Sequence, residues 1–420
     1  MLKRMPWPVI LQIVPELSAG GAERTTIEMA EAVTLAGGRA LVVSAGGRLE
    51  DELAEAGGEL IRFPAKTKNP LAMLYNAAQL ARLIRCCGVS LVHARSRAPA
   101  WSAFLAARHT QRCFVTTYHG IYNQDGRLKA WYNSVMARGD AVICNSQYTA
   151  NLVRERHPES AERVGVIYRG VDLKAFDQAA VGAERVRAIR EQWGVTGAKR
   201  IVLLPARLTR WKGQTVLIEA AAQLVARGEY GDVAFVLAGD EQTRSSFKAE
   251  LEASIEALGL RGRVFIPGHC ADMPAAFKAS AFTVLPSIEA EAFGRVSVES
   301  QAMGCPVIAS NIGAFPETVP AGPGMLAHAT SGETAAGAGG APCPPSPGPW
   351  LFEPGNAQAL CESLRYALAM DNGALEALRQ RGIERVRSSF SKRALQLQSL
   401  TVYDRLLGTQ LAEAFETASQ

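Results

Sequence analysis

The sequence lacks the markers of several common protein classes. Its eight cysteines are scattered, with no CxxC pair and no His spacing suited to zinc, so we expect the reduced thiols of a cytoplasmic protein. No uninterrupted apolar run approaches the roughly 18 residues of a membrane span, so the sequence predicts no transmembrane helix. The net charge is only +5, which gives no general support for a nucleic-acid partner.

Two further signatures are missing. No G-x-G-x-x-G follows the first predicted strand, which argues against a nicotinamide-dependent oxidoreductase. At the N-terminus, Lys3 and Arg4 precede the apolar run 9–14, as in a signal peptide. Pro6, Pro8 and Pro15 confine the apolar residues to this short stretch, and Gln12 and Glu16 fall where a signal peptide requires apolar residues. We therefore expect the first strand of a domain there.

What the sequence does contain is a regular alternation of strand-like and helix-like segments. A length of 420 residues predicts two domains, and 48% hydrophobic with 20% charged residues is typical of globular proteins. Short apolar strands between helices favour parallel sheets covered on both faces. The predicted fold class is therefore α/β, with two doubly wound Rossmann-like domains facing across a cleft and ligands at the carboxyl ends of the strands. The predicted strands are 9–14, 40–45, 90–94, 113–118, 140–146, 200–206, 233–239, 263–268, 281–287 and 306–310, and the predicted helices include 22–36, 71–86, 98–108, 214–227 and 246–258.

The charged stretch 173–198, which carries a short amphipathic helix, is the expected linker between the domains. It separates an N-terminal domain over 1–172 from a C-terminal domain over 199–397, and the last helix, at about 398–420, is expected to pack back on the N-terminal domain. Ala, Gly and Pro dominate 321–349, which cannot bury enough apolar surface to offset its ordering entropy. We therefore expect a flexible surface insertion there.

Three polar motifs follow predicted strands. Gly21 lies in SAGGAER, where glycines let a ligand approach the backbone and the next helix offers N–H groups to phosphate; the alternative is a plain turn. Arg207 and Lys212 lie in ARLTRWKG and suit a bidentate phosphate contact and a point charge; the alternative is a solvated basic loop. His119, in TTYHG, suits a polar contact to substrate or a proton transfer; the alternative is a structural histidine.

Two acids, Glu291 and Glu299, stand on either side of a Phe-Gly turn in EAFGRVSVE. The pattern predicts a loop that ends at Gly294 and a helix over 296–303. Glu291 would then precede the helix, and Glu299 would lie about one turn inside it. This arrangement suits a ligand with hydroxyls and phosphates, and the alternative is a pair of solvated charges.

Together, GGAER, TTYHG, ARLTRWKG and EAFGRVSVE, followed by GCPVIASNIGAFPETV, resemble the family-4 retaining glycosyltransferases of the GT-B fold over nearly the whole chain. One departure is Arg169, where the family often has Asn. The resemblance implies that Glu299 holds the ribose hydroxyls of a nucleotide. It also implies that Glu291 and the backbone of Phe293 and Gly294 contact the sugar and diphosphate.

The same resemblance implies roles for the other motifs. Arg207 and Lys212 would neutralise the diphosphate leaving group, His119 would contact the transferred sugar, and Gly21 would bind the donor. Cleavage of the donor develops negative charge on the phosphate, which these cations and the helix amides after Gly294 would stabilise. No D-x-D triplet occurs in the sequence, which fits a metal-independent site, so we expect no metal and no cofactor besides the nucleotide-diphosphate sugar.

For the acceptor, basic residues interleaved with tryptophan suit an anionic lipid surface, and the alternative is a solvated basic face. RSRAPAWSAFLAARH and YHGIYN also resemble enzymes of this family that build lipopolysaccharide core. We therefore expect a cytoplasmic hexosyltransferase of mannosyl or glucosyl type with a glycolipid or oligosaccharide acceptor, and we treat peripheral binding to the inner face of the cytoplasmic membrane as a hypothesis. The basic and aromatic residues are Arg95, Arg97, Arg108, Arg112, Arg127, Lys129, Trp101 and Trp131.

Two other functions stay open on the sequence alone. A nucleotide-sugar epimerase of the same fold would use the donor site without an acceptor, and only His119 and Glu291 are candidates for its acid and base. The other is a non-catalytic nucleotide-sugar-binding or scaffolding protein, and the retention of His119, Arg207, Lys212, Glu291 and Glu299 together argues against it. The nucleotide base, the sugar, the acceptor with its linkage and the oligomeric state do not follow from the sequence.

Overall fold

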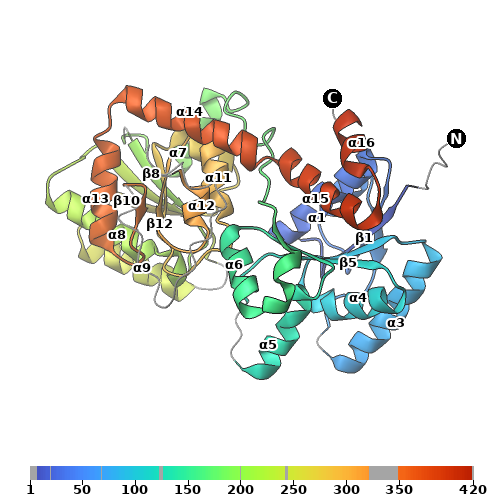
Figure 1. The fold of residues 1–420 in the computed structure, drawn as a ribbon. Coiled ribbons are helices and arrows are strands. Elements are labelled where there is room, and N and C mark those ends of the chain that lie inside the picture. The colour runs from blue at the N-terminus through green and yellow to red at the C-terminus, as the bar shows by residue number, and fades with distance from the viewer. Residues whose placement is uncertain are drawn as a thin grey trace. The chain divides into compact units, whose positions relative to one another are not determined.

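The computed structural model divides the chain into two compact units (Figure 1). Unit 1 comprises Met1–Gly170 with Ser391–Gln420, and unit 2 comprises Val171–Phe390. The boundaries expected near 172 and 398 therefore lie at 170 and 391. The insertion predicted over 321–349 falls almost wholly outside the described residues. The structure describes residues 7–18, 20–67, 69–122, 126–198, 200–241, 245–320 and 349–418.

Unit 1 is built on a parallel sheet of seven strands in the order β3-β2-β1-β4-β5-β6-β7. Its central strands are almost wholly buried, as expected for a parallel sheet covered on both faces. Side chains alternate between two cores, so that Leu11 and Ile13 face one side of the sheet and Ile10 faces the other. The strands are β1 (Val9–Ile13), β2 (Arg39–Ser44), β3 (Glu59–Arg62), β4 (Leu91–Ala94), β5 (Cys113–Tyr118), β6 (Ala141–Cys144) and β7 (Val164–Val166).

Helices cover both faces of this sheet. In Figure 1, α3 and α4 lie on one side of the strands, and α1, α15 and α16 lie on the other. The last two helices belong to the C-terminal segment, which therefore completes unit 1. None of the helices in the described part of the chain combines the length and the apolarity that a bilayer span requires. The helices are α1 (Gly21–Leu35), α2 (Glu50–Glu55), α3 (Pro70–Cys86), α4 (Arg97–His109), α5 (Arg127–Asn133), α6 (Gln147–Arg156), α15 (Lys392–Leu407) and α16 (Leu411–Ala418).

Unit 2 has a second parallel sheet, of six strands in the order β10-β9-β8-β11-β12-β13. In its central strand, Val202 and Leu204 face one core while Ile201 and Leu203 face the other. Counted from the first strand of each unit, the two sheets share the strand order 3-2-1-4-5-6. The strands are β8 (Arg200–Pro205), β9 (Val233–Ala238), β10 (Val264–Gly268), β11 (Phe282–Leu285), β12 (Val307–Ser310) and β13 (Leu351–Phe352).

Residues 173–198, expected to form a linker, lie within unit 2. Ile189 of α7, together with Trp193 and Val195 after it, is buried in the core that also holds Phe277 of α10. The segment is therefore a helical layer of unit 2 as well as the connection between the sheets. The helices are α7 (Ala183–Gln192), α8 (Gln214–Ala226), α9 (Ser245–Ala257), α10 (Met273–Ala279), α11 (Arg295–Ala302), α12 (Phe315–Thr318), α13 (Ala357–Leu368) and α14 (Asn372–Ser389).

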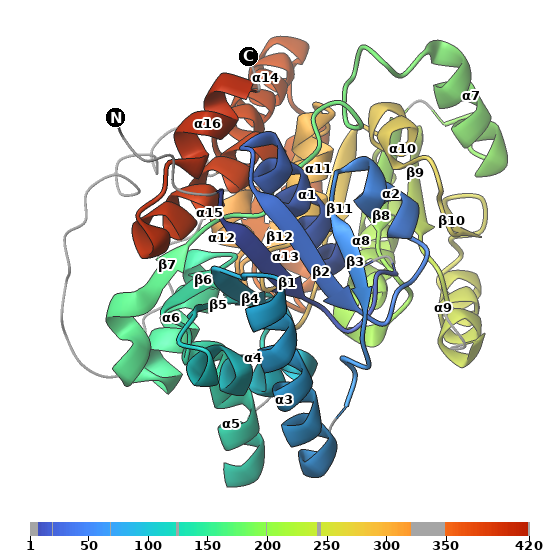
Figure 2. The same ribbon diagram turned by 90° about the vertical axis from the view of Figure 1, so that its right-hand side faces the viewer.

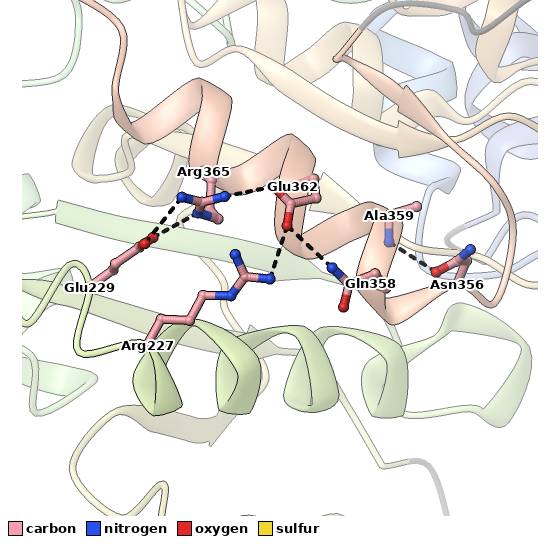
Figure 3. A network of polar contacts seen from close by, with 7 residues as sticks. All are labelled: Arg227, Glu229, Asn356, Gln358, Ala359, Glu362 and Arg365. Atoms are coloured by element: carbon pink, nitrogen blue, oxygen red, sulfur yellow. Dashed lines mark hydrogen bonds and ion pairs between the residues drawn. The ribbon is translucent and has the colours of Figure 1, made fainter.

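A surface network of charges fastens α13 against the end of α8 (Figure 3). Arg365 donates to Glu229 at 2.8 Å and to Glu362 at 2.8 Å, and Arg227 pairs with Glu362 at 3.0 Å. The carboxyl of Glu362 has a lowered pKa, chiefly because Arg365 donates a hydrogen bond to it. These side chains are 31–47% exposed, so solvent weakens the ion pairs, and we expect the network to orient α13 more than to stabilise the unit.

The strand order fixes where a ligand can bind in each unit. In a doubly wound sheet, the crevice opens at the carboxyl ends of the two strands from which the chain winds in opposite directions. These strands are β1 and β4 in unit 1, and β8 and β11 in unit 2. The polar motifs singled out in the sequence follow β1, β5, β8 and β11, and thus lie at or beside these switch points.

Candidate functional site

In unit 2, the loop after β8 is held tightly against the loop after β11. Gly213 ends the first loop with φ +73°, and a Cβ there would lie 1.8 Å from the carbonyl oxygen of Pro286. The backbone N–H of Ile288 also donates to the carbonyl of Trp211 at 2.8 Å. Only glycine fits both the positive φ and the close approach, so Gly213 is what allows the two loops to meet.

This contact brings together two of the predicted site residues, Lys212 and Glu291. The Lys212 Nζ donates to Glu291 Oε1, and the side chains are only 18% and 16% exposed. Ser287 Oγ donates to the same carboxylate oxygen at 3.1 Å, and the ammonium lies 4.1 Å from the centre of the Trp211 ring. The pair is thus a fixed, largely desolvated arrangement, which strengthens its interaction with any further charge.

A cavity of about 150 Å³ opens beside this pair. Lys212, Glu291 and Gly294 all line it, together with the first residues of α11. Gly294 precedes α11 in a left-handed conformation, φ +74°, and supplies no side-chain cap, so the first N–H groups of the helix are directed to the cavity end. The site therefore combines two cations, Lys212 and Arg295, with the positive end of a helix, which is chemistry suited to a phosphate group. Its lining residues are Leu204, Pro205, Ala206, Lys212, Leu285, Pro286, Ser287, Glu291, Gly294, Arg295, Val296 and Phe315.

The other predicted residues of unit 2 lie around this cavity and do not line it. Glu299 lies one turn into α11, where Arg295 Nε approaches its carboxylate at 2.5 Å. The Phe293 side chain is buried against the ring of Phe390, with 5.9 Å between ring centres, so only its backbone faces the turn. The Arg207 side chain is exposed at the start of the β8–α8 loop, and its carbonyl accepts from Gln214 at 2.9 Å.

Two contributors to this site were not assigned from the sequence. Arg295 lines the cavity and pairs with Glu299, and the spacing of four residues on a helix is the signal that could have identified it. Ser287 holds the Glu291 carboxylate, and it carries no sequence signal beyond its place after a strand.

In unit 1, the switch point is filled by a buried polar network. Arg95 follows β4 and donates to Gln12 Oε1 at 2.6 Å, while Gln12 Nε2 donates to the carbonyl of Thr26 at 2.9 Å. His93 makes hydrogen bonds to the Tyr403 hydroxyl, at 2.6 Å, and to a threonine of β5. Arg95 is only 2% exposed, so its grouping with lipid-facing residues was wrong: the side chain is an internal cation beside Gln12 and Tyr403.

His119 lies at the carboxyl end of β5, beside this network. Both of its ring nitrogens are buried, and no described residue hydrogen-bonds to either. Burial lowers the pKa of His119 well below its usual value, and the positive charges of Arg169 and Arg95 lower it further. The imidazole is therefore neutral near pH 7 and has one donor and one acceptor available for a ligand.

Gly21 is the first residue of α1, at the carboxyl end of β1. A Cβ at this position would lie 2.3 Å from the guanidinium nitrogens of Arg169, so a side chain here would displace that arginine. Arg169 thus links Gly21, which it contacts, to His119, on which its charge acts. The helix N-terminus and the arginine together give this end of unit 1 a positive potential.

No group of three or more His, Cys, Asp or Glu among the described residues is placed to hold a metal ion.

Comparison with known proteins identifies both halves of the chain. Residues 19–175 match the family model described as glycosyltransferase family 4, and residues 186–338 match the model described as glycosyl transferases group 1. A curated D-inositol 3-phosphate glycosyltransferase from Salinispora arenicola is 32% identical over 188 residues. That match covers 43% of this chain and 41% of the relative, so the chain spans less than half the length of the curated relatives it matches first.

Solved structures extend the likeness to the whole chain. A glycosyltransferase from Rickettsia africae is 31% identical with a TM-score of 0.83, and the alignment covers 97% of this chain and 100% of that one. HepE from Anabaena, solved in complex with UDP-glucose and with UDP and glucose, is 24% identical with a TM-score of 0.74. That alignment covers 95% of this chain and 100% of HepE. The chain therefore belongs to the family-4 glycosyltransferases of the GT-B fold.

Proposed function

We propose that the protein transfers a hexosyl unit from a nucleotide-diphosphate sugar, with retention of anomeric configuration and without a metal ion. The observation that carries this proposal is the cavity of unit 2, where Lys212, Glu291 and the N-terminus of α11 converge. HepE, which shares the fold, binds UDP-glucose, and this supports a nucleotide-sugar donor for the present chain.

The proposed chemistry follows from where charge develops. When the bond between the sugar and the diphosphate breaks, negative charge accumulates on the leaving phosphate. Lys212 and the free N–H groups at the start of α11 lie at the same cavity end, so both would interact more strongly with the leaving group than with the intact donor. Because Glu291 already holds Lys212 in place, little reorganisation is needed during the reaction.

Glu291 has a second task in this proposal. Its carboxylate accepts from Lys212 and from Ser287, and it faces the cavity with its side chain 16% exposed. A carboxylate there suits hydrogen bonds to sugar hydroxyls and stabilisation of positive charge on the anomeric carbon. Glu299, held by Arg295, is assigned the ribose hydroxyls, and Arg207 is assigned the outer phosphate oxygens, from the family resemblance.

In unit 1, His119 is assigned a contact to the transferred sugar. As a neutral imidazole with two unused nitrogens, it suits a hydroxyl as donor and as acceptor. Gly21 and the N-terminus of α1 are assigned to the donor. The retaining outcome rests on the resemblance to the family, and the absence of a metal requirement rests on the cations that the site already supplies.

For the acceptor we propose a glycolipid or glycan of the cell surface, with lipopolysaccharide core as the specific case. The support is the resemblance of 95–109 and of the YHGIYN turn to enzymes of that pathway. The donor site does not depend on this assignment, because none of the residues lining its cavity belongs to those segments.

One experiment tests the transfer itself. The purified protein is incubated with UDP-, GDP- and ADP-sugars, with and without a lipid-linked glycan acceptor, in excess EDTA. We expect one donor to be consumed slowly alone and faster with acceptor, with an α-linked donor giving an α-linked product. Interconversion of the free nucleotide sugar without acceptor would indicate an epimerase, and binding without turnover would indicate a non-catalytic protein.

A further inference from the structure

An exposed apolar stripe runs along the first half of α3. Leu71, Leu74 and Tyr75 are 78%, 58% and 65% exposed, and their spacing of three and four residues puts them on one face of the helix. The opposite face, with Leu80 and Ile84, is buried in the core of unit 1. The helix thus carries apolar side chains on its exposed face as well as on its buried face, which a helix whose outer face meets only water does not require.

A second exposed apolar group lies on the short helix α5. Leu128 is 85% exposed and Trp131 is 58% exposed. Trp131 stacks on Trp101 of α4, with 4.5 Å between ring centres and 21° between ring planes, so one of its faces is supported while the rest is open. Trp101, predicted from the sequence to face lipid, is only 7% exposed, and its ring supports that of Trp131.

The two helices form one surface. Ser102 of α4 donates to the carbonyl of Met73 in α3, and Trp101 Nε1 donates to the carbonyl of Tyr132 in α5. Figures 1 and 2 both show α3 and α5 protruding at the same end of unit 1, with α4 between them. We call this the α3–α5 surface and define it by Leu71, Leu74, Tyr75, Leu128 and Trp131.

Charge around this surface has one sign. The segment 61–139, from which α3, α4 and α5 all come, contains twelve Lys or Arg, of which Arg95 is internal, and one acid, Asp125, which lies outside the described residues. Asp140, directly after this segment, pairs with Arg108 at the end of α4. The whole chain has a net charge of only +5, so the rest of the chain is net acidic. Neither α3 nor α5 contains an acidic residue, and their exposed cations are Arg82, Arg85, Arg127 and Lys129.

The clustering is what separates this surface from ordinary exposed apolar residues. Among the described residues, each of the other exposed large apolar side chains lies on a different helix or loop: Trp7, Leu35, Leu105, Leu258, Ile288 and Tyr366. Single exposed residues of this kind need no explanation, whereas a contiguous apolar group rimmed by one sign of charge marks a docking surface. Tyr and Trp at its edge suit the interface between headgroups and hydrocarbon.

We propose that the α3–α5 surface docks on an anionic lipid bilayer, with its five apolar side chains entering the headgroup boundary and the neighbouring cations pairing with lipid phosphates. The bilayer, and no single protein partner, is the occupant because the cations are spread over two helices and match a diffuse negative surface. The inference concerns binding alone and goes beyond the proposed transfer, so either one can fail without the other.

Cosedimentation with vesicles tests the inference. The full chain is mixed with sucrose-loaded vesicles of phosphatidylcholine alone, or of phosphatidylcholine with phosphatidylglycerol, at low and at high salt. We expect binding to the anionic vesicles that weakens with salt. Leu71→Ser with Leu128→Ser should lower the partition coefficient at least about tenfold, and Arg127→Glu with Lys129→Glu should lower it by about fivefold or more per charge.

Matched controls come from the same chain. Leu258→Ser removes an exposed leucine that belongs to unit 2, and Arg187→Glu with Arg261→Glu, also in unit 2, changes the net charge as much as the basic double variant does. Both controls should leave vesicle binding unchanged within about twofold. Leu71 and Leu128 are exposed enough that their replacement should not alter the thermal midpoint, which checks the fold.

Three outcomes would overturn the inference. The first is equal binding to neutral and anionic vesicles, the second is a double leucine variant that binds as well as the native chain, and the third is no vesicle binding at all. If light scattering instead showed a dimer that the double leucine variant abolishes, the surface would belong to a second copy of the chain.

Discussion

The first six strands of each sheet follow the same order, but the polar side chains at the two switch points are arranged differently. In unit 2 the crevice between β8 and β11 is open, with a cavity of about 150 Å³ lined by Lys212 and Glu291. The equivalent place in unit 1 holds Gln12, His93 and Arg95. There Arg95 donates a hydrogen bond to Gln12, and His93 hydrogen-bonds to Tyr403. Topology therefore places both switch points, and the side chains decide that one presents its charges to a cavity while the other pairs them internally.

The difference extends to how charge is used. The Lys212–Glu291 pair is presented to a cavity, where it can act on a ligand that enters. Arg95 is enclosed, so its charge acts on protein groups. Burial lowers the pKa values of His93 and His119, and the charge of Arg95 lowers both further, together with that of Arg169 at His119. We infer that unit 2 carries the preformed ligand site and that the network of unit 1 fixes the protonation state of its histidines.

The largest effect is expected from Lys212→Ala, because it removes the cation of the open site. If Lys212 stabilises the leaving phosphate, kcat should fall together with kcat/KM, by about 10²–10³-fold. Steady-state kinetics with the preferred donor measures both constants. A higher donor KM at unchanged kcat would limit Lys212 to docking the donor and would move leaving-group stabilisation to the α11 N-terminus.

The next effect is expected at Gly213, which lets the two loops of the open site meet. Gly213→Ala should cost roughly 2–4 kcal/mol of stability, because its Cβ would clash with Pro286 at a positive φ. Gly228, just beyond the other end of α8, is the matched control: its φ is +68° and a Cβ there meets nothing within 4 Å. Gly228→Ala should cost only about 1 kcal/mol.

Denaturant unfolding and nucleotide titration distinguish the two glycine variants. Gly213→Ala should also weaken nucleotide binding, whereas Gly228→Ala should not. Equal losses of stability in both variants would mean that the left-handed conformation alone is costly and that the contact with Pro286 is not required.

A smaller effect is expected from a change of pH, and it arises from histidines of unit 1. His93 and His119 both have lowered pKa values in the folded state, so on acidification the unfolded chain takes up their protons first. Above the ordinary histidine pKa of about 6.5, both rings are neutral in the folded and the unfolded chain, so they cause no pH dependence of stability. Below that pH, the free energy of unfolding should fall by up to about 1.4 kcal/mol per pH unit for each histidine.

Thermal unfolding between about pH 7 and pH 5 measures this loss. In His119→Gln the decline should be shallower than in the native chain, and Arg95→Met should also make it shallower by removing a cation near both rings. A decline of the same slope in both variants would assign the pH dependence to other groups.

The smallest effect is expected in the network of Figure 3, which is exposed on both partners. Glu362→Gln should shift the thermal midpoint by no more than about two degrees, since exposed ion pairs contribute little. The lowered pKa of Glu362 confines what stability it adds to pH values above its ordinary range, and this is lost as the pH falls through the folded value. A large shift would mean that α13 is held mainly by these charges.

The sequence predicted the buried strands well and the edge strands poorly. The segment 113–118 was placed correctly because it is rich in β-branched and aromatic residues, and five of its six residues are buried. The edge strands β3, β7 and β13 were missed because they are short, and in β3 all four residues are at least partly exposed, so their hydrophobic pattern is weak. Residues 173–198 were read as a linker because the exposed charges of α7 outnumber its single buried Ile189.

For the site, the sequence indicated which residues carry the chemistry but not which of them touch. Lys212 and Glu291 lie far apart in the chain and meet only because β8 and β11 are neighbours in the sheet. The burial of Arg95 could not be predicted either, because its partners Gln12 and Tyr403 come from opposite ends of the chain. Pairings of this kind depend on tertiary structure and leave no local pattern.

The central claim, that the cavity of unit 2 binds a diphosphate through Lys212, is tested most directly by calorimetric titration in excess EDTA. The native chain, Lys212→Ala and Gly228→Ala are each titrated with the nucleoside diphosphate and the monophosphate of the preferred base. We expect the native chain and Gly228→Ala to bind the diphosphate more tightly than the monophosphate, and this preference to shrink by about 1.5–3 kcal/mol in Lys212→Ala. An undiminished preference in folded Lys212→Ala, or no preference in the native chain, would contradict the account.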